Sequence, residues 1–306
     1  MLKNLLFSIR GAFVLLLYAM NLVFWGVILT TFSLLRALIP WSSWQRGWYT
    51  VMNKIPDYWE DFNYWIMRIF TPTQLHTNLG NELNRKGWYL VLPNHQTWLD
   101  IIILGIVFNR KIPLLKFFMK KELAWIPFVG NCSRALDFPF MGRYSKEYLK
   151  KHPEKKGKDI EITRKACEKF KTIPTSIINF CEGTRFTQEK HDRQSSPFQY
   201  LLKPKAGGIA FVLSIMGDYL HQLLDVTTIY SPRNITLWDF CCGKVKSIDV
   251  HVRLLPIEPE LVGDYENDPK FRLVFQKWLN ELWHEKDAIY KKSLGVADIS
   301  RQDPML

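Results

Sequence analysis

An uncharged stretch near the start of the chain limits what this sequence can fold into. Gly11 to Leu35 is a run of 25 residues without a charged side chain, bounded by Arg10 and Arg36. A helix needs about 20 apolar residues to cross a bilayer. A secretory signal peptide is the rival interpretation, but the run is too long for one and no clear A-x-A cleavage site accompanies it. We therefore expect a membrane-associated helix here.

The segment that follows is rich in aromatic residues. Ten of the 30 residues from 41 to 70 are Trp, Tyr or Phe, and the first 56 residues hold five basic residues and no acidic one. Trp and Tyr favour the headgroup region of a bilayer. Residues 1–70 are thus expected to form a membrane-anchoring helical hairpin, with an apolar helix over 5–39 and an aromatic interfacial helix over 42–70. The alternative is that these aromatic residues pack a soluble core.

The orientation of this anchor stays open. Basic residues lie on both sides of the apolar run, so the positive-inside rule selects no topology. A hairpin that dips into one leaflet fits as well as a true span.

Residues 71–306 have the pattern of an α/β domain. Runs rich in β-forming residues, mostly without alternation, occur at Trp88–Leu92, Thr175–Cys181, Val226–Tyr230 and Ile248–Leu255, and helix-like stretches cover 99–108, 159–171, 206–223 and 268–291. This order predicts a mostly parallel central sheet flanked by helices. In such sheets, binding and catalytic sites lie at the carboxyl ends of the strands.

Charge and cysteine content narrow the partners. The net charge of +12 favours anionic partners, but it does not choose among nucleic acid, membrane and phosphorylated substrate. The five cysteines are odd in number and form no CxxC pair, which favours a reduced, cytosol-facing protein with no metal site. No basic cluster with stacking aromatics marks a nucleic-acid-binding motif, so we expect no nucleic acid partner.

A His–Asp pair follows the first strand of this domain. His95 and Asp100 stand five residues apart, and on one continuous helix they would point about 140° apart. They can meet only if His95 lies in a loop and Asp100 in the first helical turn. Thr97 is the expected N-cap, with Asp100 at the third helical position of a capping box. His95 would then act as a general base oriented by Asp100. The alternative is an ordinary loop histidine beside a helix-capping aspartate.

Three further motifs carry possible substrate-binding groups. Glu182, Gly183, Thr184 and Arg185 follow another strand, where glycine permits a tight turn and arginine offers donors for a phosphate. Glu182 is expected to hold that arginine or a substrate hydroxyl. Arg143 and Lys120 are further candidate phosphate ligands. Taken one at a time, each of these groups is also consistent with an ordinary turn or surface charge.

Together and in this order, the motifs resemble the glycerolipid acyltransferases, in particular the PlsC-type 1-acyl-sn-glycerol-3-phosphate acyltransferases. The family motif NHx4D is matched by Asn94, His95 and Asp100, GxxFIxR at Phe140 and Arg143, and FPEGTR by Phe180 and 182–185. Three departures stand out. Asp137 replaces the glycine of the second motif, Cys181 replaces the proline of the third, and the run 225–230 lacks the proline of the fourth. The missing proline puts acyl-chain preference in doubt more than it does the chemistry.

The resemblance implies transfer of a fatty acyl group to the sn-2 hydroxyl of lysophosphatidic acid. It implies His95 and Asp100 as catalytic residues, and Lys120, Arg143, Glu182, Gly183, Thr184 and Arg185 as substrate-binding residues. The acyl donor would be acyl-CoA or acyl carrier protein, with no other cofactor, no metal and no acyl-enzyme. The protein would be bound to a membrane, the cytoplasmic one in a bacterium, with its catalytic domain facing the cytosol. The alternatives are another lysophospholipid acceptor, or a non-catalytic lipid-binding protein of the same fold.

Overall fold

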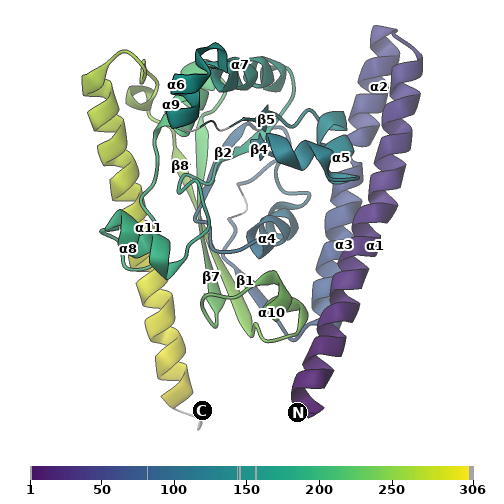
Figure 1. Cartoon of the computed structure of the whole chain (residues 1–306), viewed down its shortest axis with the longest axis vertical. Helices are drawn as coiled ribbons and strands as arrows, with labels where there is room; N and C mark the ends of the chain where they lie inside the picture. The colour runs from purple at the N-terminus through teal and green to yellow at the C-terminus, as the bar shows by residue number, and fades with distance from the viewer. Residues whose placement is uncertain (1, 81, 143, 145, 156, 303–306) are drawn as a thin grey trace.

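The computed structural model describes residues 2–302 apart from 81, 143, 145 and 156. A twisted sheet stands at the centre, the long C-terminal helix α11 (Pro269–Gln302) covers one face, and α4 (Leu99–Phe108) covers the other (Figure 1). Two N-terminal helices, α1 (Leu2–Leu38) and α3 (Ile55–Phe70), form an outer layer beyond α4. The expected α/β architecture with an apolar N-terminal helix is confirmed.

The main sheet has six strands in the order β1-β8-β7-β2-β6-β3. They are β1 (Gln74–Thr77), β2 (Tyr89–Pro93), β3 (Leu115–Phe117), β6 (Ser176–Ile178), β7 (Gln222–Ser231) and β8 (Ser247–Pro256). Strands β7, β2, β6 and β3 run parallel, whereas β8 pairs antiparallel with β7 and parallel with β1. The short strands β4 (Met119–Lys120) and β5 (Phe140–Met141) pair separately. The carboxyl ends of β2 and β6 therefore lie next to each other.

The remaining α-helices are α2 (Ser42–Met52), α5 (Val129–Ala135), α6 (Lys146–Lys151), α7 (Lys158–Lys171), α8 (Gln188–Gln194), α9 (Gly207–Met216) and α10 (Leu237–Cys241). Of these, α2 lies between α1 and α3, and the others lie between strands. One apolar core lies between the sheet and α7, α9 and α11, and a second lies between the sheet and α4, α10, α1 and α3. Both faces of the sheet are covered, which explains why its strands are apolar without alternation.

Two of the expected elements differ in the structure. The helix expected over 206–223 ends at Met216, because residues from Gln222 onward belong to β7 and pair with both β2 and β8. The single interfacial helix expected over 42–70 is two helices, α2 and α3. The break falls at Asn53 and Lys54, directly before Pro56, which is tolerated only in the first turn of a helix.

The N-terminal helices are amphipathic in three dimensions. Val14 and Tyr18 of α1 are buried against the catalytic domain, and α1 also contacts α10 and α5. The opposite face of α1 exposes large apolar side chains at helical spacing: Phe13, Leu16, Met20, Phe24 and Val27. Helix α3 does the same with Tyr58, Phe62, Trp65 and Ile69. By length and composition, α1 is the one helix of the described chain that could cross a membrane. Its packing holds it along the side of the domain.

Candidate active site

The first and third motifs meet at the carboxyl edge of the sheet. The amide of Asn179 donates to the carbonyl of Val91 at 2.9 Å, which extends the pairing of β6 with β2. Beyond the strands, the amide of Phe186 donates to the carbonyl of His95 at 2.8 Å. Segments about 90 residues apart in sequence are thereby held side by side. This is the juxtaposition expected of neighbouring parallel strands.

His95 and Asp100 form the expected pair. Nδ1 of His95 lies 2.8 Å from Oδ2 of Asp100, whose side chain is fully buried, while the His95 side chain is 16% exposed. Because a carboxylate can only accept, Nδ1 carries the proton and Nε2 presents its lone pair. His95 lies in the loop after β2 and Asp100 in the first turn of α4, as the spacing requires. The geometry is that of an oriented general base.

The capping box was predicted with Thr97 as the N-cap and Asp100 as the acceptor. The structure has Asp100 as an acceptor but a different N-cap residue. Trp98, not Thr97, is the N-cap of α4, and no side chain caps this helix. Asp100 nevertheless accepts from the amides of Gln96 at 2.7 Å and Thr97 at 3.0 Å. These bonds fold the loop around the carboxylate and bring His95 to it. Asp100 thus organises the helix start and orients His95 at the same time.

Two neighbours fix the loop that carries His95. The side-chain amide of Asn94 donates to the carbonyl of Thr228 at 3.0 Å and accepts from its amide at 2.8 Å, which ties the loop to β7. The Phe180 ring stacks on the His95 ring, with centroids 4.0 Å apart. Asn94 and Phe180 belong to the recognised motifs; Asn94 is fully buried and Phe180 is half-buried. Both act on the placement of His95.

Glu182 lies beneath the loop rather than beside Arg185. Its side chain is buried, and Oε1 accepts from the His95 amide at 3.4 Å. Burial raises the pKa of Glu182 well above its ordinary range, while the His95 amide opposes this shift. The expected ion pair with Arg185 is not among the contacts of the described residues. Burial favours the protonated, neutral form of Glu182. The side chain therefore supports the loop and is poorly placed to form an ion pair with Arg185.

The turn from Gly183 to Arg185 is held from several sides. Gly183 has a φ of 69°, a conformation that glycine adopts at little cost. Nζ of Lys190 donates to the hydroxyl of Thr184 at 3.0 Å and to the carbonyl of Arg185 at 2.9 Å. The guanidinium of Arg185 lies over the half-exposed Trp98 ring, 4.4 Å from its centroid. Arg185 is thus positioned beside the start of α4, near the His–Asp pair.

A buried lysine braces the same edge of the sheet from the other face. Nζ of Lys286, on α11, donates to the carbonyls of Leu92 at 2.9 Å and Val226 at 2.7 Å, and it forms an ion pair with Asp225. Arg253 of β8 also pairs with Asp225, at 2.6 Å. This lysine therefore satisfies one backbone carbonyl near the end of β2 and one in the middle of β7.

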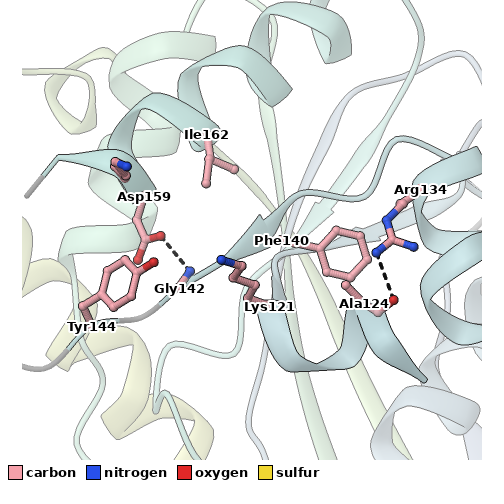
Figure 2. A pocket seen from close by; sticks show the side chains of 9 residues that line it. Lys121, Ala124, Arg134, Phe140, Gly142, Tyr144, Asp159 and Ile162 are labelled. Atoms are coloured by element: carbon pink, nitrogen blue, oxygen red, sulfur yellow. Dashed lines mark hydrogen bonds between the residues drawn. The ribbon is translucent and has the colours of Figure 1, made fainter. Parts of the chain in front are cut away.

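The segment that carries Lys120 leads to a pocket lined by cationic side chains. Lys120 is exposed on β4, and Lys121 follows it at the rim of a pocket of about 310 Å³ (Figure 2). Its walls include Lys121, Ala124, Arg134, Phe140, Gly142, Tyr144, Lys158, Asp159 and Ile162. The Asp159 carboxylate accepts from the Gly142 amide at 2.7 Å. Three cations around one engaged carboxylate favour an anionic ligand.

Ring contacts connect His95 with the segment that leads to this pocket. Phe117 stacks on Phe180, with centroids 6.3 Å apart, and Phe180 in turn stacks on His95. Lys121 follows Phe117 by four residues, which an extended chain spans in about 13 Å. Arg143, the remaining predicted phosphate ligand, lies outside the described residues.

The departure at Asp137 has a structural explanation. Asp137 has a φ of 59°, and its carboxylate pairs with Lys169 at 2.8 Å. Glycine adopts this left-handed conformation readily, and aspartate is one of the few other residues that tolerate it. The replacement therefore preserves the backbone turn that a glycine would provide.

Local sequence did not identify four residues that hold this site: Trp98, Lys190, Tyr230 and Lys286. Tyr230 donates to Oδ1 of Asp100 at 2.5 Å from a strand 130 residues away. Lys286 lies in the stretch 268–291, which the sequence predicted only to be helical. No short motif marks such contacts. Within the described part of the chain, no group of three or more His, Cys, Asp or Glu side chains is placed to hold a metal ion.

A His–Asp pair at the carboxyl edge of a mostly parallel sheet, with cations nearby, places this protein among the α/β enzymes whose site lies at that edge. The sequence model of one enzyme family, Acyltransferase, matches residues 76–230 of this chain. The chain belongs to this Acyltransferase family.

Individual relatives agree with this assignment. The chain is 25% identical over 238 residues to the 1-acyl-sn-glycerol-3-phosphate acyltransferase delta of Homo sapiens, a match that covers 73% of this chain and 56% of the relative. It is 23% identical to the gamma form of Homo sapiens over 303 residues, covering 94% of this chain and 72% of that protein. The chain thus spans little more than half the length of the delta relatives.

A solved structure shares the fold. The crystal structure of the 1-acyl-sn-glycerophosphate (LPA) acyltransferase PlsC from Thermotoga maritima superimposes with a TM-score of 0.53. The match covers 92% of this chain and 96% of that one, at 18% sequence identity. Both the sheet and the N-terminal helices therefore fall within a known architecture.

Proposed function

We propose that this protein transfers a fatty acyl group from an acyl thioester to the sn-2 hydroxyl of lysophosphatidic acid, giving phosphatidic acid. The observation that carries the proposal is the contact of His95 with the buried Asp100 at the sheet edge. The names of the relatives, 1-acyl-sn-glycerol-3-phosphate acyltransferases, support lysophosphatidic acid as the acceptor. Acyl-CoA or acyl carrier protein would supply the acyl group.

In the proposed reaction, Nε2 of His95 removes the proton of the sn-2 hydroxyl. The oxygen attacks the thioester carbonyl, and the tetrahedral intermediate collapses with departure of the carrier thiolate. The imidazolium returns its proton to that thiolate, so the enzyme ends in its starting state. Asp100 stabilises the imidazolium while it exists. Neither an acyl-enzyme nor a metal is part of this scheme.

The oxyanion needs donors that are not already engaged. The amides of Gln96 and Thr97 donate to Asp100 and cannot serve. The amide of Gly183 also donates, to the carbonyl of Phe180 at 2.9 Å, so we assign the oxyanion to the amides of Thr184 and Arg185, which follow it in the same turn. Arg185 and Lys120, with Arg143, would hold the phosphate of the acceptor, and the cationic pocket supports binding of a phosphorylated substrate. The role proposed for Glu182 is to support the loop from below.

The apolar faces of α1 and α3 would lie in one leaflet of the membrane. A lipid acceptor is dissolved in that leaflet, so this placement keeps the acceptor near the sheet edge while the thioester arrives from the cytosol. The packing of α1 along the domain supports an embedded hairpin over an isolated span.

The test uses membranes that carry the unmutated protein or the His95→Ala variant. They are incubated with lysophosphatidic acid and a radiolabelled acyl-CoA or acyl carrier protein, and phosphatidic acid is quantified. We expect turnover with the unmutated protein and a loss of at least about 100-fold with His95→Ala. The control is His284→Ala, which changes a histidine that stacks on Phe198, away from this edge.

The acceptor is tested in the same membranes. Lysophospholipids with choline, ethanolamine or glycerol headgroups replace lysophosphatidic acid one at a time. Faster turnover with one of these lysophospholipids than with lysophosphatidic acid would indicate that the protein remodels existing phospholipids. Equal, measurable turnover by His95→Ala and unmutated protein would remove the general-base mechanism. No turnover by the unmutated protein with any of these acceptors would leave lipid binding as the function.

A further inference from the structure

The carboxylate of Asp100 is held by four hydrogen-bond donors. Oδ2 accepts from Nδ1 of His95 and from the amides of Gln96 and Thr97, all three within the loop before α4. Oδ1 accepts from the hydroxyl of Tyr230 at 2.5 Å. Tyr230 lies in β7, so the fourth donor comes from the sheet rather than from the loop.

Oδ1 is the atom whose loss of a partner would matter most. Asp100 is fully buried, and in the described part of the chain Tyr230 is the donor that reaches Oδ1. A buried carboxylate oxygen left without a donor is costly, because water cannot replace the lost bond. Without the hydroxyl, the carboxylate would rotate about its Cβ–Cγ bond or recruit a proton, and either change alters its bond to His95.

Tyr230 is also held rigidly. The side chain is 1% exposed and packs in the core that contains Leu99 and Ile103 of α4. Two residues earlier in the same strand, Thr228 binds the side chain of Asn94. One strand therefore fixes both ends of the segment from Asn94 to Asp100. Burial, with the Asp100 charge, raises the pKa of Tyr230 well above its ordinary value, so the hydroxyl keeps its proton and donates.

We propose that Tyr230 is a positioning residue of the site, the third member of a Tyr230–Asp100–His95 chain that locks the rotation of the Asp100 carboxylate. The inference rests on the proposed function for its kinetic consequence and on geometry alone for its structural one. When His95 becomes a cation, the Asp100 carboxylate has to stay ionised and keep Oδ2 directed at Nδ1 of His95. The hydrogen bond from the hydroxyl of Tyr230 to Oδ1 holds the carboxylate in that orientation. Tyr230 itself touches no reacting atom.

The kinetic arm compares Tyr230→Phe with the unmutated protein under saturating acceptor and donor. The change removes one oxygen and keeps the ring. We expect kcat to fall roughly 10- to 100-fold, the range for losing a hydrogen bond to a charged group, with both KM values within about twofold. The matched control is Tyr89→Phe, in which a buried tyrosine of β2 loses its bond from the Asn84 amide. Tyr89→Phe is expected to keep kcat within about twofold.

The second arm does not need turnover. A histidine Nδ1 proton bonded to a carboxylate gives a strongly downfield proton NMR signal. In protein purified in detergent, this signal should vanish in His95→Ala, move or disappear in Tyr230→Phe, and stay in place in Tyr89→Phe. If Tyr230→Phe does not fold, 3-fluorotyrosine at position 230 preserves the shape, and its more acidic hydroxyl should displace the same signal.

The outcomes separate the two proposals. An unmoved His95 signal in Tyr230→Phe or in the fluorotyrosine protein overturns the positioning role, whatever the kinetics show. Unchanged kcat in Tyr230→Phe, with active unmutated protein, overturns it as well. If the unmutated protein transfers no acyl group but the signal moves, the positioning role stands and the proposed function fails.

Discussion

A buried glutamate between the N-terminal helices and the catalytic domain makes stability depend on pH. Glu60 of α3 is 8% exposed, and its Oε2 accepts from the Asn63 amide at 3.0 Å. It packs so closely on Gly105 of α4 that a Cβ there would come within 2.1 Å of Oε1. Asn63 also accepts from Asn21 of α1 at 2.8 Å. Burial raises the pKa of Glu60 from 4.5 to about 8.

The sign of the pH effect follows from this raised pKa. The folded protein keeps the Glu60 proton up to about pH 8, whereas the unfolded chain releases it near 4.5. The stabilisation is therefore complete below pH 4.5 and is lost as the pH rises through 8. The interval from 4.5 to about 8, at about 1.4 kcal/mol per pH unit, sets an upper limit of roughly 5 kcal/mol.

Glu60→Gln replaces the carboxyl group with a neutral group of the same shape that still accepts from Asn63. At pH 5 we expect its thermal midpoint to lie within a few degrees of the unmutated value. At pH 9 we expect it to be higher by up to roughly 10 °C. Tryptophan fluorescence of the protein in lipid nanodiscs reports the transition, since the chain has 12 Trp residues.

The control is Glu281→Gln on α11, the same substitution at an exposed site paired with Lys277. Its midpoint should follow that of the unmutated protein at every pH. If the Glu60→Gln and unmutated midpoints also ran parallel from pH 5 to 9, Glu60 would not carry a buried proton and the reasoning would be refuted.

Two further predictions concern the frame of the site and the membrane. Lys286→Met leaves the carbonyls of Leu92 and Val226 without this donor and Asp225 with Arg253 alone. It should lower the free energy of unfolding by roughly 3 kcal/mol, against little change for the exposed Lys277→Met, and a loss below about 1 kcal/mol would contradict the buried pairing. Replacing Trp65 and Ile69 together with Glu should weaken flotation with phospholipid vesicles about 100-fold or more, whereas Glu at Leu273 and Val274 of α11 should not. Equal flotation of the two double variants would place the membrane face elsewhere.

The local sequence predicted the element that begins at His95 well. The helix expected over 99–108 is α4 with those bounds, and the loop position of His95 follows from the five-residue spacing to Asp100. These are short-range properties, because a helix start depends on the few residues that flank it. The long apolar helix was predictable for the same reason, since its composition alone favours a helix in an apolar environment.

Predictions from sequence were less accurate for elements whose hydrogen-bonding partners are distant along the chain. The strands β1, β3, β4 and β5 have two to four residues each and carry too short a pattern to stand out. The end of α9 was misplaced because the chain turns after Met216 and the last two residues of the expected helix already belong to β7, a strand stabilised on both sides by other strands. Glu182 was expected to hold Arg185 or a substrate hydroxyl; the first alternative paired neighbours in sequence, but Glu182 is buried whereas Arg185 lies over the Trp98 ring.

The sequence alone thus determined which groups are available for the proposed chemistry: a histidine, its partner carboxylate, a glycine turn with an arginine, and a long apolar helix. Only the tertiary structure decided how they are held. Tyr230 reaches Asp100 across 130 residues, Asn94 reaches Thr228 across 134, and Lys286 reaches Leu92 across 194. Such contacts form because packing strands and helices together buries polar groups that must then find partners. No local pattern encodes which distant residue will be the partner.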